Sequence, residues 1–225
     1  MDEVATADNL QKRKPTLKYV VDILFPASRD SVILDLGCGH GALIQYARQR
    51  GYAEITGVDI SAQQVELAAR LGIKGISQCD LFQALSAIEP GSVDAVIAFD
   101  VIEHFDRREL FDFADKVRIA LKKGGRWIIH APNGASPFAG SVIYGDITHE
   151  IAFTPSSLSQ LVAATGFRSI NFYECAPRCH SLKSALRAAM WLCIRLILRI
   201  AILAETGGWK SSCIISRNFY AIAWN

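Results

Sequence analysis

The chain has 225 residues, 51% hydrophobic and 20% charged, which argues against a disordered chain and allows one elaborated domain with a full core. Its 24 basic and 22 acidic residues give a formal net charge of +2, which excludes a broadly basic surface for nucleic acid. The first residues hold no basic segment followed by an apolar run, and the six cysteines are scattered, so we expect a reduced cytoplasmic protein without a secretory signal.

Short apolar runs alternate with longer amphipathic segments through the first part of the chain. A helix near residues 15–25 is expected to precede the first strand. The pattern then predicts buried parallel strands with amphipathic helices between them, which is typical of a doubly wound α/β sheet. The predicted strands cover residues 31–36, 54–59, 74–79, 93–99 and 126–131, and the predicted helices cover 42–50, 62–71 and 108–121.

The second part of the chain is less regular. Residues 132–153 are rich in Gly, Pro, Asn and Ser without a clear period, which predicts a long functional loop over the active face. A helix at 155–164 and a strand at 167–173 follow, a long helix covers 181–204, and the last strand covers 213–224. We therefore expect a single domain over 1–225, with a cofactor-binding core and loop at 15–173, a helical insertion at 174–212 and a final strand at 213–225.

A glycine-rich loop follows the first predicted strand. Gly37, Gly39 and Gly41 allow a tight turn and a close approach of the backbone to a ligand. Nicotinamide-binding loops space their glycines as G-x-G-x-x-G, whereas the third glycine here comes one residue earlier. Asp35 precedes the loop, and its carboxylate suits a ligand that carries an ammonium and a sulfonium group but repels a pyrophosphate. The loop therefore favours S-adenosylmethionine as the cofactor.

Acidic residues end the next two predicted strands. Asp59 stands where its carboxylate can accept hydrogen bonds from both hydroxyls of a ribose. Asp80 stands where it can bond to the amino group of an adenine. Taken singly, each residue can also be a solvated loop acid or a helix cap.

Together these residues resemble the pattern of the class I S-adenosylmethionine-dependent methyltransferases. That pattern continues here with the pair Glu103 and His104 after the fourth strand and with the L-K-x-G-G turn of residues 121–126 before the fifth. The resemblance spans residues 15–173, and residues 149–167 look similar to methyltransferases of bacterial surface-polysaccharide and small-molecule pathways. It implies a Rossmann-like doubly wound seven-stranded sheet whose last strand is antiparallel, with the helical insertion between strands six and seven. The cofactor-binding residues expected are Asp35, Gly37, Cys38, Gly39, Gly41, Asp59, Ile60, Asp80, Leu81, Phe99 and Asp100.

Methyl transfer to a hydroxyl group requires in-line alignment and a base that removes the proton. Three residues on the expected active face are catalytic candidates: His104, Asp146 and His149. His149 is the preferred base, because histidine side chains titrate near neutral pH and its loop follows the fifth strand. The family resemblance implies that His104 orders the loop around the cofactor, and the alternative that His149 is an ordinary turn residue stays open.

No metal site is predicted. Cys175, Cys179 and His180 form a C-x3-C-H cluster, but the sequence has no second ligand pair of matching spacing.

The long helix at 181–204 is apolar nearly all round. Lys183, Arg187, Arg195 and Arg199 stand on one i+4 row, with Trp191 between the second and the third. Four cations argue against a transmembrane span, because charges at the centre of a bilayer are costly. The pattern favours a helix that lies on the membrane surface, while a helix packed on the core and a dimer interface stay open as alternatives.

The sequence favours an enzyme that uses S-adenosylmethionine to O-methylate a sugar, a lipid-linked glycan or another small molecule at the inner face of a membrane. N- or C-methylation of a soluble metabolite, a nicotinamide-dependent oxidoreductase and a non-catalytic cofactor-binding or scaffold module are the alternatives. A nucleic-acid acceptor is disfavoured by the nearly balanced charge, and a homodimer stays open.

Overall fold

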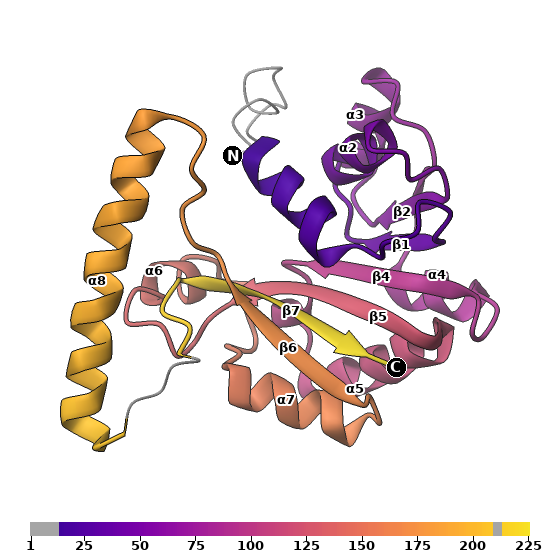
Figure 1. Ribbon diagram of the computed structural model, residues 1–225. Coiled ribbons are helices and arrows are strands. Elements are labelled where there is room, and N and C mark those ends of the chain that lie inside the picture. The colour runs from indigo at the N-terminus through magenta and orange to yellow at the C-terminus, as the bar shows by residue number, and fades with distance from the viewer. Residues whose placement is uncertain (1–13, 209–212) are drawn as a thin grey trace.

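The structure of the chain is a computed structural model that describes residues 14–208 and 213–225. Its centre is a seven-stranded sheet in the order β3-β2-β1-β4-β5-β7-β6, in which β7 runs antiparallel to both of its neighbours (Figure 1). This arrangement confirms the predicted Rossmann-like sheet. The strands are β1 (Ile33–Leu36), β2 (Ile55–Asp59), β3 (Ile76–Gln78), β4 (Val93–Phe99), β5 (Leu121–Pro132), β6 (Ser169–Glu174) and β7 (Asn218–Trp224).

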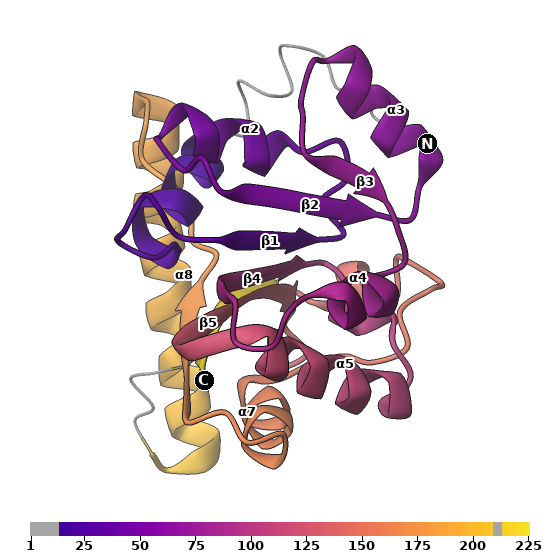
Figure 2. The same cartoon turned by 90° about the vertical axis from the view of Figure 1, so that its right-hand side faces the viewer.

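Helices cover both faces of the sheet (Figure 2). Apolar side chains of an N-terminal helix at 14–24, which ends in a π-helical turn, pack with those of α2 on one face. The helices α4, α5 and α7 contribute to the core on the other face. Each face of the sheet is therefore buried, which explains why its parallel strands are apolar without alternation. The helices are α2 (Ala42–Gln49), α3 (Ala62–Arg70), α4 (Leu81–Ala87), the 3-10 turn η2 (Ile102–His104), α5 (Arg107–Ala120), α6 (Gly140–Ile143), α7 (Pro155–Ala164) and α8 (Leu182–Thr206).

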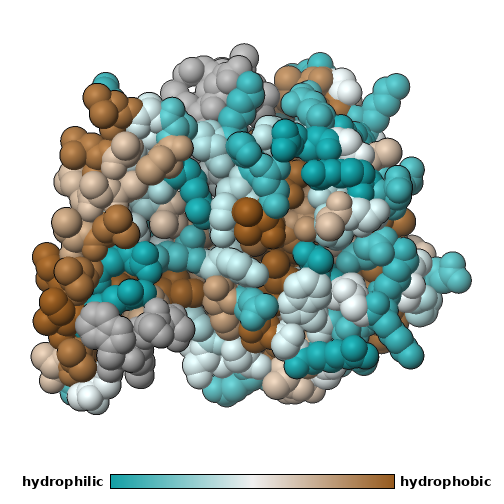
Figure 3. All heavy atoms as spheres, viewed as in Figure 1, coloured by the Kyte–Doolittle hydropathy of each residue, from teal (hydrophilic) through white to brown (hydrophobic). Residues whose placement is uncertain are grey.

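The long helix α8 stands beside the sheet, next to α6, and packs on neither face of the sheet (Figure 1). Ser184 is its only buried residue within the described part of the chain. One edge of the molecular surface is therefore hydrophobic and appears brown in Figure 3. The alternative of a helix packed on the core is wrong, because no apolar residue of α8 is buried. None of the helices in the described ranges is long and apolar enough to cross a membrane.

Several boundaries differ from the sequence predictions. The last strand begins at Asn218 and not at residue 213. The backbone N–H groups of Ile215 and Ser216 donate to the side chain of Glu174, at 3.0 and 3.1 Å from Oε1, in place of a neighbouring strand. The third strand is shorter than expected. The helices α4 and α6 were missed since each is only one or two turns long, too short for a clear apolar period.

Gly57 in β2 is a tight point of the fold beside the glycine loop. A Cβ atom there would lie 2.6 Å from Ile44 Cδ1 and 2.8 Å from Cys38 Cβ. The Cβ atom of Cys38 is bonded to the backbone and cannot move away without shifting the glycine loop. We expect Gly57→Ala to destabilise the protein by about 2 kcal/mol through overpacking. Gly140→Ala is the matched control, because nothing lies within 4 Å of its Cβ position. Urea unfolding followed by circular dichroism measures both variants, and equal stability of the two would contradict the packing described here.

Candidate active site

The loop between β1 and α2 carries the three glycines in left-handed conformations. Gly37, Gly39 and Gly41 have φ values of +71°, +54° and +80°, which residues with a side chain rarely adopt. Asp59 at the end of β2 holds the loop in place, since its Oδ2 accepts a hydrogen bond of 2.7 Å from the Gly39 N–H. Its Oδ1 accepts one of 2.9 Å from the Ser61 N–H. The acid at the end of the second strand therefore shapes the loop directly.

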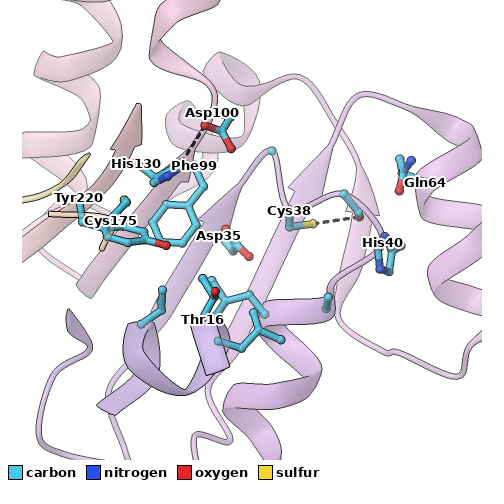
Figure 4. A pocket seen from close by; sticks show the side chains of 16 residues that line it. Thr16, Asp35, Cys38, His40, Gln64, Phe99, Asp100, His130, Cys175 and Tyr220 are labelled. Atoms are coloured by element: carbon cyan, nitrogen blue, oxygen red, sulfur yellow. Dashed lines mark hydrogen bonds and ion pairs between the residues drawn. The ribbon is translucent and has the colours of Figure 1, made fainter. Parts of the chain in front are cut away.

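A cavity of about 670 Å³ opens at the carboxyl ends of β1, β4 and β5 (Figure 4). Open α/β sheets bind their ligands at this edge, at the point where the strand order reverses. The N-terminal helix closes one side of the cavity with Thr16, and Cys175 and Tyr220 close another. Six of the predicted cofactor-binding residues lie in its wall: Asp35, Gly37, Cys38, Gly39, Phe99 and Asp100.

Asp35 lies at the floor of this cavity and is 3% exposed. Burial raises the pKa of its carboxyl group to about 8, and the nearby charge of Asp59 contributes in the same direction. Burying an ionised carboxylate is costly unless a cation pairs with it. The floor of the cavity is therefore suited to a ligand that brings its own positive charge.

A second, smaller cavity of about 270 Å³ adjoins the first. Its wall includes Asp59, Ile60, Asp80 and Leu81, and it shares Gly37 and Asp100 with the larger cavity. All the predicted cofactor-binding residues except Gly41 therefore line one cavity or the other. Gly41 caps the N-terminus of α2 and has Ile73 and Ile76 of the core against its Cα.

Asp80 has the structural role that stayed open from the sequence. Its Oδ1 accepts hydrogen bonds from the backbone N–H groups of Phe82 and Gln83, at 2.9 and 3.1 Å, and so caps α4. The same side chain lies in the wall of the smaller cavity. The helix cap fixes the orientation of the carboxylate and leaves the residue beside a ligand.

Two residues at the ends of β4 and β5 form a pair that was not predicted. His130 Nδ1 lies 2.7 Å from Asp100 Oδ1, and both side chains line the larger cavity (Figure 4). Asp100 has a φ of +53° and is the only residue other than glycine with positive φ in the described ranges. Such a conformation is strained and is common at functional sites. His130 was missed because it lies inside an apolar strand pattern, although its position opposite Phe99 in the ladder places it at the ligand edge.

The three predicted catalytic residues come together elsewhere. The rings of His104 and His149 are 4.9 Å apart, and Asp146 Oδ1 accepts a hydrogen bond of 2.7 Å from Thr148 Oγ1. His104 lines the smaller cavity, whereas Asp146 and His149 line neither of the two cavities. The base role of His149 stays a prediction from the sequence.

The residues present fit S-adenosylmethionine. The buried carboxyl group of Asp35 offers a partner to an ammonium group. A Cβ atom on Gly37, which lines both cavities, would lie 2.7 Å from Val101 Cγ2, so glycine is the residue that fits there. An acid-flanked G-x-G-x-G loop at this edge of a sheet with an antiparallel β7 defines the class I methyltransferase fold.

Comparison with known proteins agrees with this class. Residues 34–127 match the family described as "Methyltransferase domain". Over these residues the chain is similar to the S-adenosylmethionine-dependent methyltransferases, and S-adenosylmethionine is the cofactor that such a domain uses.

Individual relatives are distant. The chain is 28% identical over 154 residues to a ubiquinone biosynthesis O-methyltransferase of Idiomarina loihiensis, and the match covers 61% of this chain and 62% of that relative. A structure of an S-adenosylmethionine-dependent methyltransferase from Archaeoglobus fulgidus superposes with a TM-score of 0.68 at 19% identity and covers 98% of this chain and all of that one. Phosphoethanolamine N-methyltransferase 2 of Haemonchus contortus, solved with S-adenosyl-L-methionine, has a TM-score of 0.63 at 21% identity and covers 92% of this chain and 52% of that one. These structures show the fold.

Proposed function

We propose that this protein transfers a methyl group from S-adenosylmethionine to a hydroxyl group of an amphiphilic small molecule at a membrane surface. The observation that carries the proposal is the pair of His130 and Asp100, 2.7 Å apart in the wall of the larger cavity. A hydroxyl acceptor is the one that needs a base, because its oxygen is a weak nucleophile until the proton leaves.

The donor is held by residues of both cavities in this proposal. Asp35 pairs with the ammonium group, Asp59 accepts hydrogen bonds from the ribose hydroxyls, and Asp80 bonds to the adenine amino group. When bound, S-adenosylmethionine supplies an electrophilic methyl group on its sulfonium. Gly37 lets the backbone approach the ligand where the two cavities join.

His130 is the general base in this proposal. Asp100 accepts the Nδ1–H of His130, which leaves Nε2 as the nitrogen that takes the proton of the acceptor hydroxyl. Asn218 Nδ2 lies 3.4 Å from Nε2, a long contact that a bound hydroxyl can replace. The Idiomarina loihiensis relative is an O-methyltransferase, which supports oxygen as the methylated atom.

A third cavity, next to the larger of the two already described, supports an acceptor with an apolar part. It has a volume of about 310 Å³ and is lined by Phe138 of the 132–153 loop and by Trp191 of α8. Cys175 lines both this third cavity and the larger cavity, so the two spaces adjoin. Arg187 and Arg217 stand at the third cavity and suit an anionic group on the acceptor.

The outer face of α8 supports a membrane surface as the place of reaction. Large apolar side chains there are more than half exposed, among them Leu186 at 64% and Ile197 at 66%. Arg195 of the basic row faces the body of the protein instead, since it forms an ion pair of 2.9 Å with Glu174 at the end of β6. Arg195 therefore does not reach outward, and the large apolar side chains remain on the outer face. A face of this kind is suited to the acyl boundary of a bilayer.

Vesicle sedimentation tests the membrane surface. We expect the wild-type chain to sediment with vesicles that contain anionic lipid. The double change Leu186→Asn with Ile197→Asn is expected to lower the bound fraction at least about tenfold, because each change removes exposed apolar area that the bilayer would bury. Phe111→Asn is the matched control, an exposed apolar residue on α5. Equal binding of all three proteins, or dimers in solution that the double variant disrupts, would contradict the membrane surface and favour an interface between two copies.

Transfer of labelled methyl from S-adenosylmethionine tests the acceptor. Incubated with a membrane extract, the protein is expected to place label in the lipid phase, in a form that resists mild alkali as a methyl ether does. Label only in the aqueous phase would favour a soluble metabolite. Absence of label together with tight cofactor binding would favour a non-catalytic module.

A further inference from the structure

A cluster of three side chains lies beside the cofactor cavities and has no part in the proposed reaction. Glu103 and His104 belong to η2, directly after β4, and His149 belongs to the loop after α6. One ligand atom from each of the three lies within 4.8 Å of the other two. His104 and His149, which are 45 positions apart in the sequence, thus lie close together in the folded chain.

Both histidines contact a backbone carbonyl oxygen through Nδ1. His104 Nδ1 lies 3.2 Å from the carbonyl oxygen of Thr148, and His149 Nδ1 lies 3.1 Å from the carbonyl oxygen of Ile143. A carbonyl oxygen only accepts, so each Nδ1 carries the proton and each Nε2 keeps its lone pair. Histidines that bind metal ions are commonly held in this way, with the other ring nitrogen donating to a backbone carbonyl.

Thr148 fits the same arrangement. Its Oγ1 lies 2.9 Å from His104 Nδ1 and donates its own proton to Asp146 Oδ1 at 2.7 Å, so it also accepts from the histidine. These bonds fix the ring of His104 before any ligand arrives. Asp146, one of the three catalytic candidates from the sequence, thus serves to orient a neighbour.

Glu103 supplies the second, independent observation. It is 1% exposed, and neither of its carboxyl oxygens has a hydrogen-bond partner in the part of the chain that the structure describes. Burial raises the pKa of this carboxyl group to about 8, and the charges of Asp100 and Asp146 act in the same direction. Its backbone carbonyl meanwhile accepts from the N–H groups of Glu150 and Ile151, at 2.8 and 3.1 Å, which holds the loop over it. A buried carboxyl group without partners is costly, and a cation beside it removes that cost.

We infer that Glu103, His104 and His149 form a binding site for one divalent transition-metal ion. Two neutral imidazole nitrogens and one carboxylate are the donor set of zinc sites that keep a position open, and Zn²⁺ is the metal that this set suits best. The ion ties the 144–151 loop to η2. Because His104 also lines the smaller cavity, the ion stiffens the wall beside the cofactor. His149 is a metal ligand in this assignment and not the base.

Zinc titration of the full-length chain, stripped with a chelator and followed by competition with a coloured zinc indicator, tests the site. The wild-type chain is expected to bind one Zn²⁺ and to unfold at a higher temperature with zinc than without it. His149→Ala and Glu103→Gln are each expected to lower zinc affinity at least about tenfold and to remove the thermal shift. His149 lies on a partly exposed loop, so its removal leaves the core untouched.

His180→Ala is the matched control, because the exposed His180 belongs to the C-x3-C-H cluster, whose residue types can bind zinc but for which no metal site is predicted. It is expected to keep the full zinc affinity. Two outcomes would overturn the inference: a wild-type chain that binds no zinc, or a zinc affinity that His180→Ala lowers while His149→Ala and Glu103→Gln leave it unchanged. Both outcomes are measured by zinc binding and thermal unfolding and not by methyl transfer, so they test the metal site independently of the proposed reaction.

Discussion

Replacing Asp35 by asparagine is expected to weaken binding of S-adenosylmethionine by at least about 100-fold, because truncating one partner of a buried charge pair costs roughly 2–5 kcal/mol. Asparagine has the size of aspartate but carries no charge. The shape of the cavity floor is therefore kept, and only the attraction to the ammonium group is lost. A calorimetric titration of the ligand into both proteins measures the difference.

The same substitution is expected to stabilise the ligand-free protein at pH 8, by about 1–3 kcal/mol. A carboxyl group whose pKa is higher in the folded than in the unfolded protein binds more protons when folded, so stability falls as the pH rises from about 4, its usual value, towards about 8. Asp35→Asn removes this loss. Glu103 has a raised pKa of similar size but is common to both proteins, and its effect cancels in the difference.

Asp115→Asn is the control for both measurements, because Asp115 is an exposed acid on α5. It is expected to change neither the affinity nor the slope of stability with pH. If Asp35→Asn bound the cofactor as well as the wild-type chain does, the assignment of the cavity floor to the ammonium group would be wrong.

Removing the imidazole of His130 is expected to lower the turnover rate by about 10²–10⁴, the range typical of a general base. The dissociation constant of S-adenosylmethionine should stay nearly unchanged, because His130 faces the acceptor side of the cavity rather than the loop that holds the donor. Steady-state kinetics of His130→Ala with saturating cofactor provide the measurement.

His149→Ala is the informative comparison, since the sequence favours His149 as the base and the structure offers His130. A large loss of turnover in His149→Ala with normal turnover in His130→Ala would show that His149 is the base, as the sequence predicts, and that His130 is not. Asp100→Asn is expected to fall between the wild-type chain and His130→Ala, because it keeps the histidine but no longer accepts its Nδ1–H as a charged partner.

The cofactor side could be predicted from the sequence because its signals are local. A glycine loop, an acid two residues before it and acids at successive strand ends each follow from chain order, since parallel strands bring their carboxyl ends to one edge. Asp35, Asp59 and Asp80 lie at that edge in the structure. Gly41 satisfied the same pattern for another reason, the left-handed cap of α2.

The other features of the site could not be predicted in the same way because their residues meet only in the folded chain. His130 and Asp100 are 30 positions apart and pair through the register of β4 with β5. Glu103 and His149 converge through backbone bonds of the loop that follows α6. Arg195 of α8 pairs with Glu174 at the end of β6, and this ion pair turns its side chain toward the protein. Helical periodicity finds such a row but does not say which side it faces.

The most direct test of the central claim is a calorimetric titration of S-adenosylhomocysteine, the demethylated cofactor, into the wild-type chain, with NADH titrated in parallel. We predict one binding site per chain for S-adenosylhomocysteine and no measurable binding of NADH. Binding of NADH with no binding of S-adenosylhomocysteine would contradict the account and favour an oxidoreductase.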